Sequence, residues 1–174
     1  MTVLNRSPMV RKATNKLLQK AKKSKSDEFY TQLCDIQNEL CFYKTHFKNK
    51  VVYCNCDDPR TSNFFQYFSS NFEELGLEKL LTSCYQEQSE DLFIENNQAR
   101  GFFSEHTRLN RVNRKINSPE ILLFNGDGDF RSSESIELLM QADIVVTNPP
   151  FSLFREYVEQ LVKHQKKVFS NWKC

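Results

Sequence analysis

The segment Asp143-Ile144-Val145-Val146-Thr147-Asn148-Pro149-Pro150-Phe151 is the most informative part of the sequence for predicting the fold. Asp143 to Thr147 is almost wholly apolar, which is typical of a central strand in a parallel sheet, where both faces are buried. Pro149 and Pro150 then end the strand, because each proline fixes φ and lacks an amide donor. The next residues, Phe154 to Lys163, have the pattern of a helix. The segment therefore predicts a strand, a rigid loop and a helix.

The loop residues Asn148, Pro149, Pro150 and Phe151 suit the chemistry of an exocyclic amine. Such a nitrogen shares its lone pair with the ring and attacks a methyl donor poorly. The Asn148 side-chain oxygen and the Pro149 carbonyl could accept its two hydrogens and free that lone pair, while Phe151 offers a flat face for stacking a base. The alternative is a plain turn that closes a strand, as Asn-Pro sequences often do.

Outward from this segment, strands alternate with helices. We expect strands at 51–54, 78–85, 120–124 and 166–169, and helices at 31–47, 62–75 and 132–140, with Thr31 and Ser132 or Ser133 as N-caps and Gly76 just past a helix end. Residues 86–118 have weak periodicity and predict a long connection, with a strand pair near 100–103. The order indicates an α/β fold with a mostly parallel sheet.

Ligands of such sheets bind beyond the carboxyl ends of the strands. Three loops are expected at that edge: 53–58, the loop at Asp129 and Phe130, and the Asn148 loop. The acids around Asp129 could also belong to a calcium loop or to a solvated glycine turn. The calcium loop is excluded, because Phe130 and Ile136 stand where it requires Gly and a bidentate Glu.

The charge is unevenly distributed. Residues 1–26 carry eight Lys or Arg and no acid, whereas the other 148 residues carry 16 basic and 22 acidic side chains. This basic arm could neutralise phosphates of double-stranded DNA, or it could be a solvated tail. At 174 residues the chain has one domain's worth of sequence.

The cysteines and the amino terminus concern the compartment and metals. The six cysteines form no CxxC pair, and no hydrophobic signal segment or apolar run of membrane-spanning length occurs. We therefore expect a cytoplasmic protein with reduced thiols, no membrane contact and no metal site. Pro-Cys, the nucleophile pair for attack on a cytosine ring carbon, is absent from the sequence.

Four motifs in order resemble the EcoRI-type adenine-specific DNA methyltransferases. They are Ser26-Asp27-Glu28-Phe29-Tyr30-Thr31-Gln32, Val51 to Pro59 with Ser62-Asn63-Phe64, Gly128-Asp129-Phe130-Arg131-Ser132, and Asp143 to Phe154. The resemblance covers about residues 26–167. It implies a Rossmann-like class I methyltransferase sandwich of three layers, S-adenosyl-L-methionine as cofactor, and methyl transfer to N6 of an adenine flipped out of DNA, as the modification partner of a restriction system.

The resemblance also assigns residues. Phe29, Tyr30 and Thr31 would pack over the methionine part of the donor. Asn55 and Asp57 stand where most methyltransferases have a glycine-rich donor loop. Asp129 would accept from the donor's adenine amino group, with Phe130 beside the ring. The acid for the donor ribose is not evident, and Glu87 is the nearest candidate.

The chain departs from the family pattern after Lys167, where the expected strand stops. We therefore expect a basic arm at 1–26 and a partial catalytic domain at 27–174, with the sheet incomplete at its C-terminal edge and the target-recognition region absent. A separate C-terminal half could complete it. The alternatives are an inactive truncated remnant that binds nucleic acid or a partner chain, and methylation of RNA or of protein glutamine.

Overall fold

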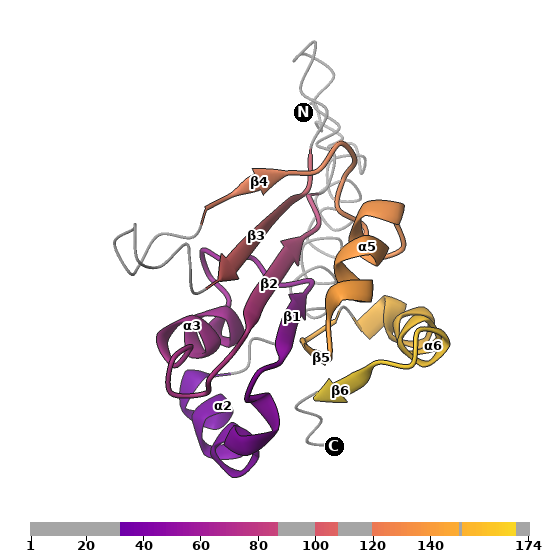
Figure 1. Cartoon of the computed structure of the whole chain (residues 1–174). Coiled ribbons are helices and arrows are strands. Elements are labelled where there is room, and N and C mark those ends of the chain that lie inside the picture. Colours follow the sequence, from indigo (N-terminus) through magenta and orange to yellow (C-terminus); the bar gives the residue numbers. More distant parts are fainter. Residues whose placement is uncertain (1–31, 87–99, 108–119, 150, 170–174) are drawn as a thin grey trace, which may run out of the picture.

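The computed structural model describes residues 32–86, 100–107, 120–149 and 151–169. These residues form a six-stranded sheet with helices against both faces (Figure 1). In chain order the elements are α2 (Leu33–Leu40), η1 (Cys41–Phe47), β1 (Val51–Asn55), α3 (Asn63–Ser70), β2 (Lys79–Cys84), β3 (Phe102–Thr107), β4 (Leu122–Leu123), α5 (Ser133–Gln141), β5 (Ile144–Val146), η2 (Phe151–Leu153), α6 (Phe154–Lys163) and β6 (Lys167–Phe169).

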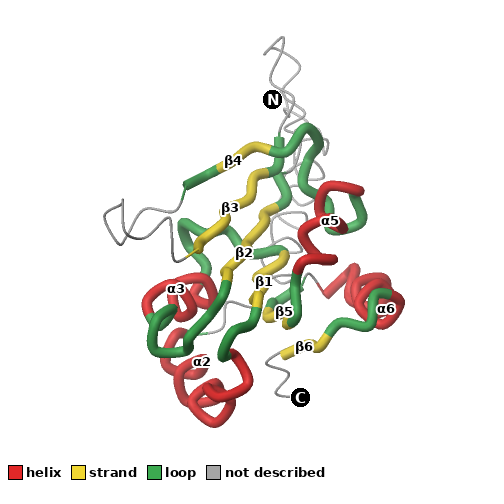
Figure 2. The backbone as a smooth tube through the Cα atoms, viewed as in Figure 1, coloured by secondary structure: helices red, strands yellow, loops and turns green. Residues whose placement is uncertain are grey.

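The strand order in the sheet is β4-β3-β2-β1-β5-β6. The pairs β2–β1, β1–β5 and β5–β6 are parallel, whereas β3 runs antiparallel to both β2 and β4. The parallel centre confirms the predicted α/β fold. The predicted strand at 120–124 is only two residues long. It lies at the edge of the sheet (Figure 2), where it pairs antiparallel with β3, so the sheet is mixed.

Two hydrophobic clusters make the three layers. One lies between the sheet and α2 and α3, and its strand residues are Val52, Cys54, Leu80, Ile144 and Val146. The other lies between the sheet and α5 and α6, and takes Tyr53, Leu81 and Val145. Because side chains alternate along a strand, β1 and β5 feed both clusters and are buried on both faces.

Two helix boundaries differ from the prediction. The first helix has Gln32, not Thr31, at its N-cap, with no side-chain cap, and its second half is the 3₁₀ helix η1. The helix predicted to reach residue 75 ends at Ser70. There the Asn71 side chain donates to the Tyr67 carbonyl at 2.8 Å and competes with the helical hydrogen bonds. The helices α5 and α6 begin where predicted, and Ser132 caps α5.

Candidate functional site

Asn55 ties the ends of three strands together. Its side chain is 2% exposed, and its Oδ1 accepts a hydrogen bond from Ser83 Oγ of β2 at 3.1 Å. Its backbone carbonyl accepts from the hydroxyl of Thr147, which directly follows β5. Tyr53 Oη and Ser83 Oγ lie 2.6 Å apart and complete the group. The carboxyl ends of β1, β2 and β5 are therefore joined by buried polar contacts.

Asp57 lies beside this junction with a buried carboxyl group. Its backbone is held on β2, since its amide donates to the Ser83 carbonyl at 2.9 Å and its carbonyl accepts from Thr82 Oγ1 at 2.6 Å. Its Oδ1 accepts from Ser62 Oγ at 2.7 Å, whereas its buried Oδ2 has no hydrogen-bond partner among the described residues. Burial raises the pKa of Asp57 to about 7, against the opposing effect of the Ser62 and Thr147 hydroxyls.

The turn that carries Asp129 is fixed against the end of β2 by backbone contacts. The Gln86 amide donates to the Asp127 carbonyl at 2.9 Å. Gly128 has φ +79°, and a Cβ there would lie 2.7 Å from the Cys84 carbonyl oxygen. This close approach requires glycine, and it brings the Asp129 turn to the same sheet edge as Asn55 and Asp57.

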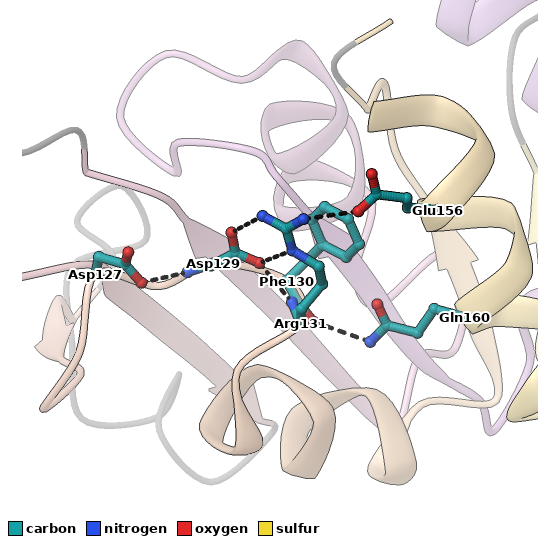
Figure 3. A network of polar contacts seen from close by, with 6 residues as sticks. All are labelled: Asp127, Asp129, Phe130, Arg131, Glu156 and Gln160. Atoms are coloured by element: carbon teal, nitrogen blue, oxygen red, sulfur yellow. Dashed lines mark hydrogen bonds and ion pairs between the residues drawn. The ribbon is translucent and has the colours of Figure 1, made fainter. Parts of the chain in front are cut away.

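Asp129 forms a fork with Arg131, shown in Figure 3. Oδ1 accepts from the Arg131 amide at 2.8 Å and from Nε at 2.9 Å, and Oδ2 accepts from a terminal guanidinium nitrogen at 2.7 Å. The other terminal nitrogen donates to Glu156 of α6 at 2.7 Å. The hydrogen bonds from Arg131 hold the pKa of Asp129 below its ordinary value, so the carboxylate is ionised and acts only as an acceptor.

Phe130 points into the core. Its side chain is 4% exposed and packs edge-on against Tyr157 of α6, with ring centroids 5.2 Å apart. The prediction that Phe130 lies beside the donor ring therefore applies at most to the small exposed part of its side chain.

The predicted catalytic loop leaves the end of β5 beside Asn55. Thr147 is 1% exposed, Asn148 is half-buried and Pro149 is buried. Phe151, on η2, is 46% exposed at the surface. Pro150 lies outside the described residues, as do the predicted donor residues Phe29, Tyr30 and Thr31 and the ribose candidate Glu87.

The structure thus brings Asn55, Asp57, the Asp129 turn and the Asn148 loop to one edge of the sheet. Sequence reasoning missed the residues that hold them: Ser62, Thr82, Ser83, Thr147 and Glu156. One signal was present, because Thr82 and Ser83 are polar residues that follow the apolar Leu80 and Leu81 toward the end of β2. The local sequence around Glu156 carries no comparable signal.

The described residues contain neither a candidate metal site nor a candidate membrane span. No group of three or more His, Cys, Asp and Glu side chains is placed to bind a metal ion there. Within the same ranges, no helix has the length and apolar character needed to cross a membrane.

The chain is similar to known methyltransferases. The family described as adenine-specific methyltransferase EcoRI matches residues 17–170. The Type II methyltransferase M.EcoRI of Escherichia coli is 61% identical over 159 residues, which cover 91% of this chain and 49% of that protein. M.MgeORF184P of Mycoplasma genitalium and M.MpnI of Mycoplasma pneumoniae, also Type II methyltransferases, are 41% and 42% identical over 148 residues, covering 85% of this chain and 41% of each relative.

The chain therefore spans about half the length of these curated relatives, or less. No solved structure matches it significantly. The family match covers most of the chain and includes all four motifs described above. The chain belongs to the EcoRI family of adenine-specific methyltransferases.

Proposed function

We propose that residues 27–174 form the donor-binding and catalytic part of a DNA adenine N6-methyltransferase that uses S-adenosylmethionine and modifies DNA in a restriction system. The observation that carries the proposal is the position of Asn148 and Pro149. They follow the buried strand β5 with only Thr147 between, and β5 pairs with β1, which ends at Asn55, two residues before Asp57. The loop that could accept hydrogen bonds from the target amine and the polar residues that could bind the methyl donor thus lie at one edge of the sheet.

Two features of the site fit the methyl donor. The buried Asp57 Oδ2 has no hydrogen-bond partner among the described residues, so a donor N–H or O–H would satisfy it. Asp129 accepts three hydrogen bonds from Arg131, and a carboxylate has about four acceptor positions. One position on Oδ2 is left for the adenine amino group. When bound, S-adenosylmethionine supplies a methyl group on a positively charged sulfur.

The reaction requires three contributions from this chain's residues. The Asn148 side-chain oxygen and the Pro149 carbonyl accept hydrogen bonds from the target amine, so that its lone pair is free to form the new N–C bond as the C–S bond breaks. The methylated nitrogen then releases one proton to water, and S-adenosylhomocysteine is the leaving group. Phe151, partly exposed on η2, stacks against the flipped adenine. Lys and Arg of the arm at 1–26, which lies outside the described residues, would contact the phosphates.

The rival function is donor binding without transfer, as in a catalytically inactive remnant. In such a remnant, Asn55, Asp57 and Asp129 would still bind the methyl donor, but the Asn148 loop would not take part in catalysis.

The test uses the full chain with tritium-labelled S-adenosylmethionine and unmethylated genomic DNA. We expect label in N6-methyladenine, and Asn148→Ala to lower the rate about 100-fold or more, as the loss of one preorganised polar group does, with donor affinity nearly unchanged. The control is Gln141→Ala, which removes an exposed amide at the far end of α5. Calorimetric donor binding without transfer would support the remnant, and transfer that survives Asn148→Ala would contradict the proposed mechanism.

A further inference from the structure

We propose that Arg131 and Glu156 are positioning residues that lock the acid Asp129 to helix α6, the helix that follows the catalytic loop. Their bridge would fix the bound donor relative to Asn148. The inference rests on the proposed function, because it takes Asp129 as the acceptor for the donor's adenine amino group. No residue of the bridge other than Asp129 needs to touch the donor.

The fork between Arg131 and Asp129 fixes the orientation of the carboxylate. Arg131 donates its amide, its Nε and one terminal nitrogen to Asp129, at 2.8, 2.9 and 2.7 Å. These bonds fix the plane of the carboxylate, and a planar guanidinium does this in a way that a lysine cannot. They also fill both acceptor positions of Oδ1 and one of Oδ2. The remaining position points in one direction, which suits a single N–H donor.

Helix α6 holds the Asp129 turn through Arg131 and Phe130. The remaining terminal nitrogen of Arg131 donates to Glu156 at 2.7 Å, and Gln160 donates to the Phe130 carbonyl at 2.9 Å (Figure 3). Glu156 and Gln160 are four residues apart and therefore share one face of the helix. Tyr157 packs on the Phe130 ring. Helix α6 thus contacts both Phe130 and Arg131, the two residues that follow the acid.

Helix α6 is close to the predicted catalytic loop in the sequence. Glu156 is in the first turn of α6, which begins at Phe154 directly after η2. Between Asn148 and that turn lie only the loop and η2. A shift of α6 relative to the Asp129 turn would therefore move Asn148 relative to a donor held by Asp129.

The bridge is exposed, which argues against a mainly stabilising role. The side chains of Arg131 and Glu156 are 50% and 54% exposed, and ion pairs at that exposure contribute little to folding stability. What the bridge can supply is a fixed orientation of the Asp129 carboxylate. The affinity of a ligand that makes one directed hydrogen bond to this carboxylate would report on that orientation.

The experiment compares two ligands by calorimetry on the full chain. S-adenosylhomocysteine carries the amino group, whereas S-inosylhomocysteine carries a carbonyl oxygen that an ionised Asp129 repels. We expect the unaltered protein to prefer the amino ligand by about tenfold or more, which is what one hydrogen bond to a charged group supplies. In Arg131→Met the affinity for the amino ligand and the preference should both fall about tenfold.

Three further variants make the test specific. Arg131→Lys keeps the charge but not the fork, so it should recover little of the preference. Glu156→Gln keeps Asp129 and the fork and breaks only the charged link to α6, and we expect a loss of preference of about threefold, smaller because a neutral hydrogen bond remains. The matched control is Glu159→Gln on the same helix, whose partner Arg155 is 94% exposed, and its preference should equal that of the unaltered protein.

The outcomes separate the two claims. If the unaltered protein binds neither ligand, the proposed function is overturned and this inference with it. If it binds and prefers the amino ligand, but Glu156→Gln and Arg131→Lys keep the full preference, the positioning role is wrong while the proposed function stands. Should Arg131→Met fail to fold by circular dichroism, the Lys and Gln variants decide.

Discussion

Two turns of the molecule use the same side-chain chemistry in different surroundings. The turn at 58–62 leads into α3 and the turn at 129–132 leads into α5. In each, an arginine two residues after an aspartate donates its amide, Nε and a terminal nitrogen at 2.8, 2.9 and 2.7 Å, Asp58 with Arg60 and Asp129 with Arg131. In each, a serine caps the helix that follows, Ser62 and Ser132.

The difference lies in what each arginine and each flanking residue touches. Arg60 lies over the Phe102 ring of β3 at 4.4 Å, whereas Arg131 reaches Glu156 on α6. Before the first aspartate stands the buried acid Asp57, and before the second stands Gly128 with positive φ. The same local motif starts a helix in both places. Its tertiary contacts decide whether it also serves as a link between elements, and the following changes test this comparison.

The largest expected effect is at Gly128. Alanine there would adopt an unfavourable φ and press its Cβ against the Cys84 carbonyl, so Gly128→Ala should lower the free energy of unfolding by about 4 kcal/mol. Gly126→Ala is the control, since its Cβ would meet only the Glu134 side chain at 3.6 Å, and it should change stability by about 1 kcal/mol or less. Urea unfolding measures both. Equal losses would show that the second turn is not fixed by its close approach to β2.

The next effect concerns the buried acid Asp57, because the second turn has Gly128 at the equivalent position. Because the folded-state pKa of about 7 lies above the ordinary 3.8, the folded protein holds this proton more tightly than the unfolded chain. This contribution to stability is present below about pH 4, is lost as the pH rises to about 7, and stays lost above it. Asp57→Asn should therefore remove that decline and raise stability at pH 8 by at most about 4 kcal/mol, since each of the roughly three pKa units between 3.8 and 7 corresponds to about 1.4 kcal/mol. Unfolding at pH 5, 6, 7 and 8 measures the slope, and an unchanged slope in the variant would assign it elsewhere.

The two caps should differ by a smaller amount. Ser132→Ala removes a cap and should cost about 1 kcal/mol. Ser62→Ala should cost about 2 kcal/mol, because Ser62 also donates to the buried Asp57 carboxyl at 2.7 Å. The loss at Ser62 should shrink when Asp57→Asn is already present. A double-mutant cycle of unfolding free energies measures this coupling, and simple additivity would show that the two residues act independently.

The smallest stability effect is expected at the bridge. Glu156→Gln should change the free energy of unfolding by less than about 1 kcal/mol, the same as Glu159→Gln, because both acids are exposed. Thermal unfolding of the two variants side by side makes the comparison. A clearly larger loss in Glu156→Gln would mean that the bridge serves the fold and not only the geometry of the site.

The sequence predicted the parallel centre of the sheet because the signals for these strands lie within a few neighbouring residues. The apolar runs of β1, β2 and β5 and the cap at Ser132 each lie within a few residues. The antiparallel position of β3 and β4 depends on pairing across the long connection, which local periodicity does not contain. The end of α3 at Ser70 depended on one side-chain hydrogen bond from Asn71.

The same distinction applies to the site. Asn55, Asp57, Asp129 and Asn148 were predicted as candidate residues from their motifs. The residues that hold them were not predicted, because they are distant in the sequence: Ser83 and Thr147 lie 28 and 92 residues from Asn55, and Glu156 lies 25 residues from Arg131. Burial of Phe130 was missed for a related reason, since its neighbour Tyr157 lies on α6 and no pattern around Phe130 indicates that contact.

The most direct test of the account is a structure of the full chain with S-adenosylhomocysteine. We expect the adenine amino group within hydrogen-bond distance of Asp129 Oδ2, with Arg131 still bridging to Glu156, and the sulfur facing the Asn148 side chain. A ligand bound away from the carboxyl ends of β1 and β5, or with its sulfur remote from Asn148, would contradict it.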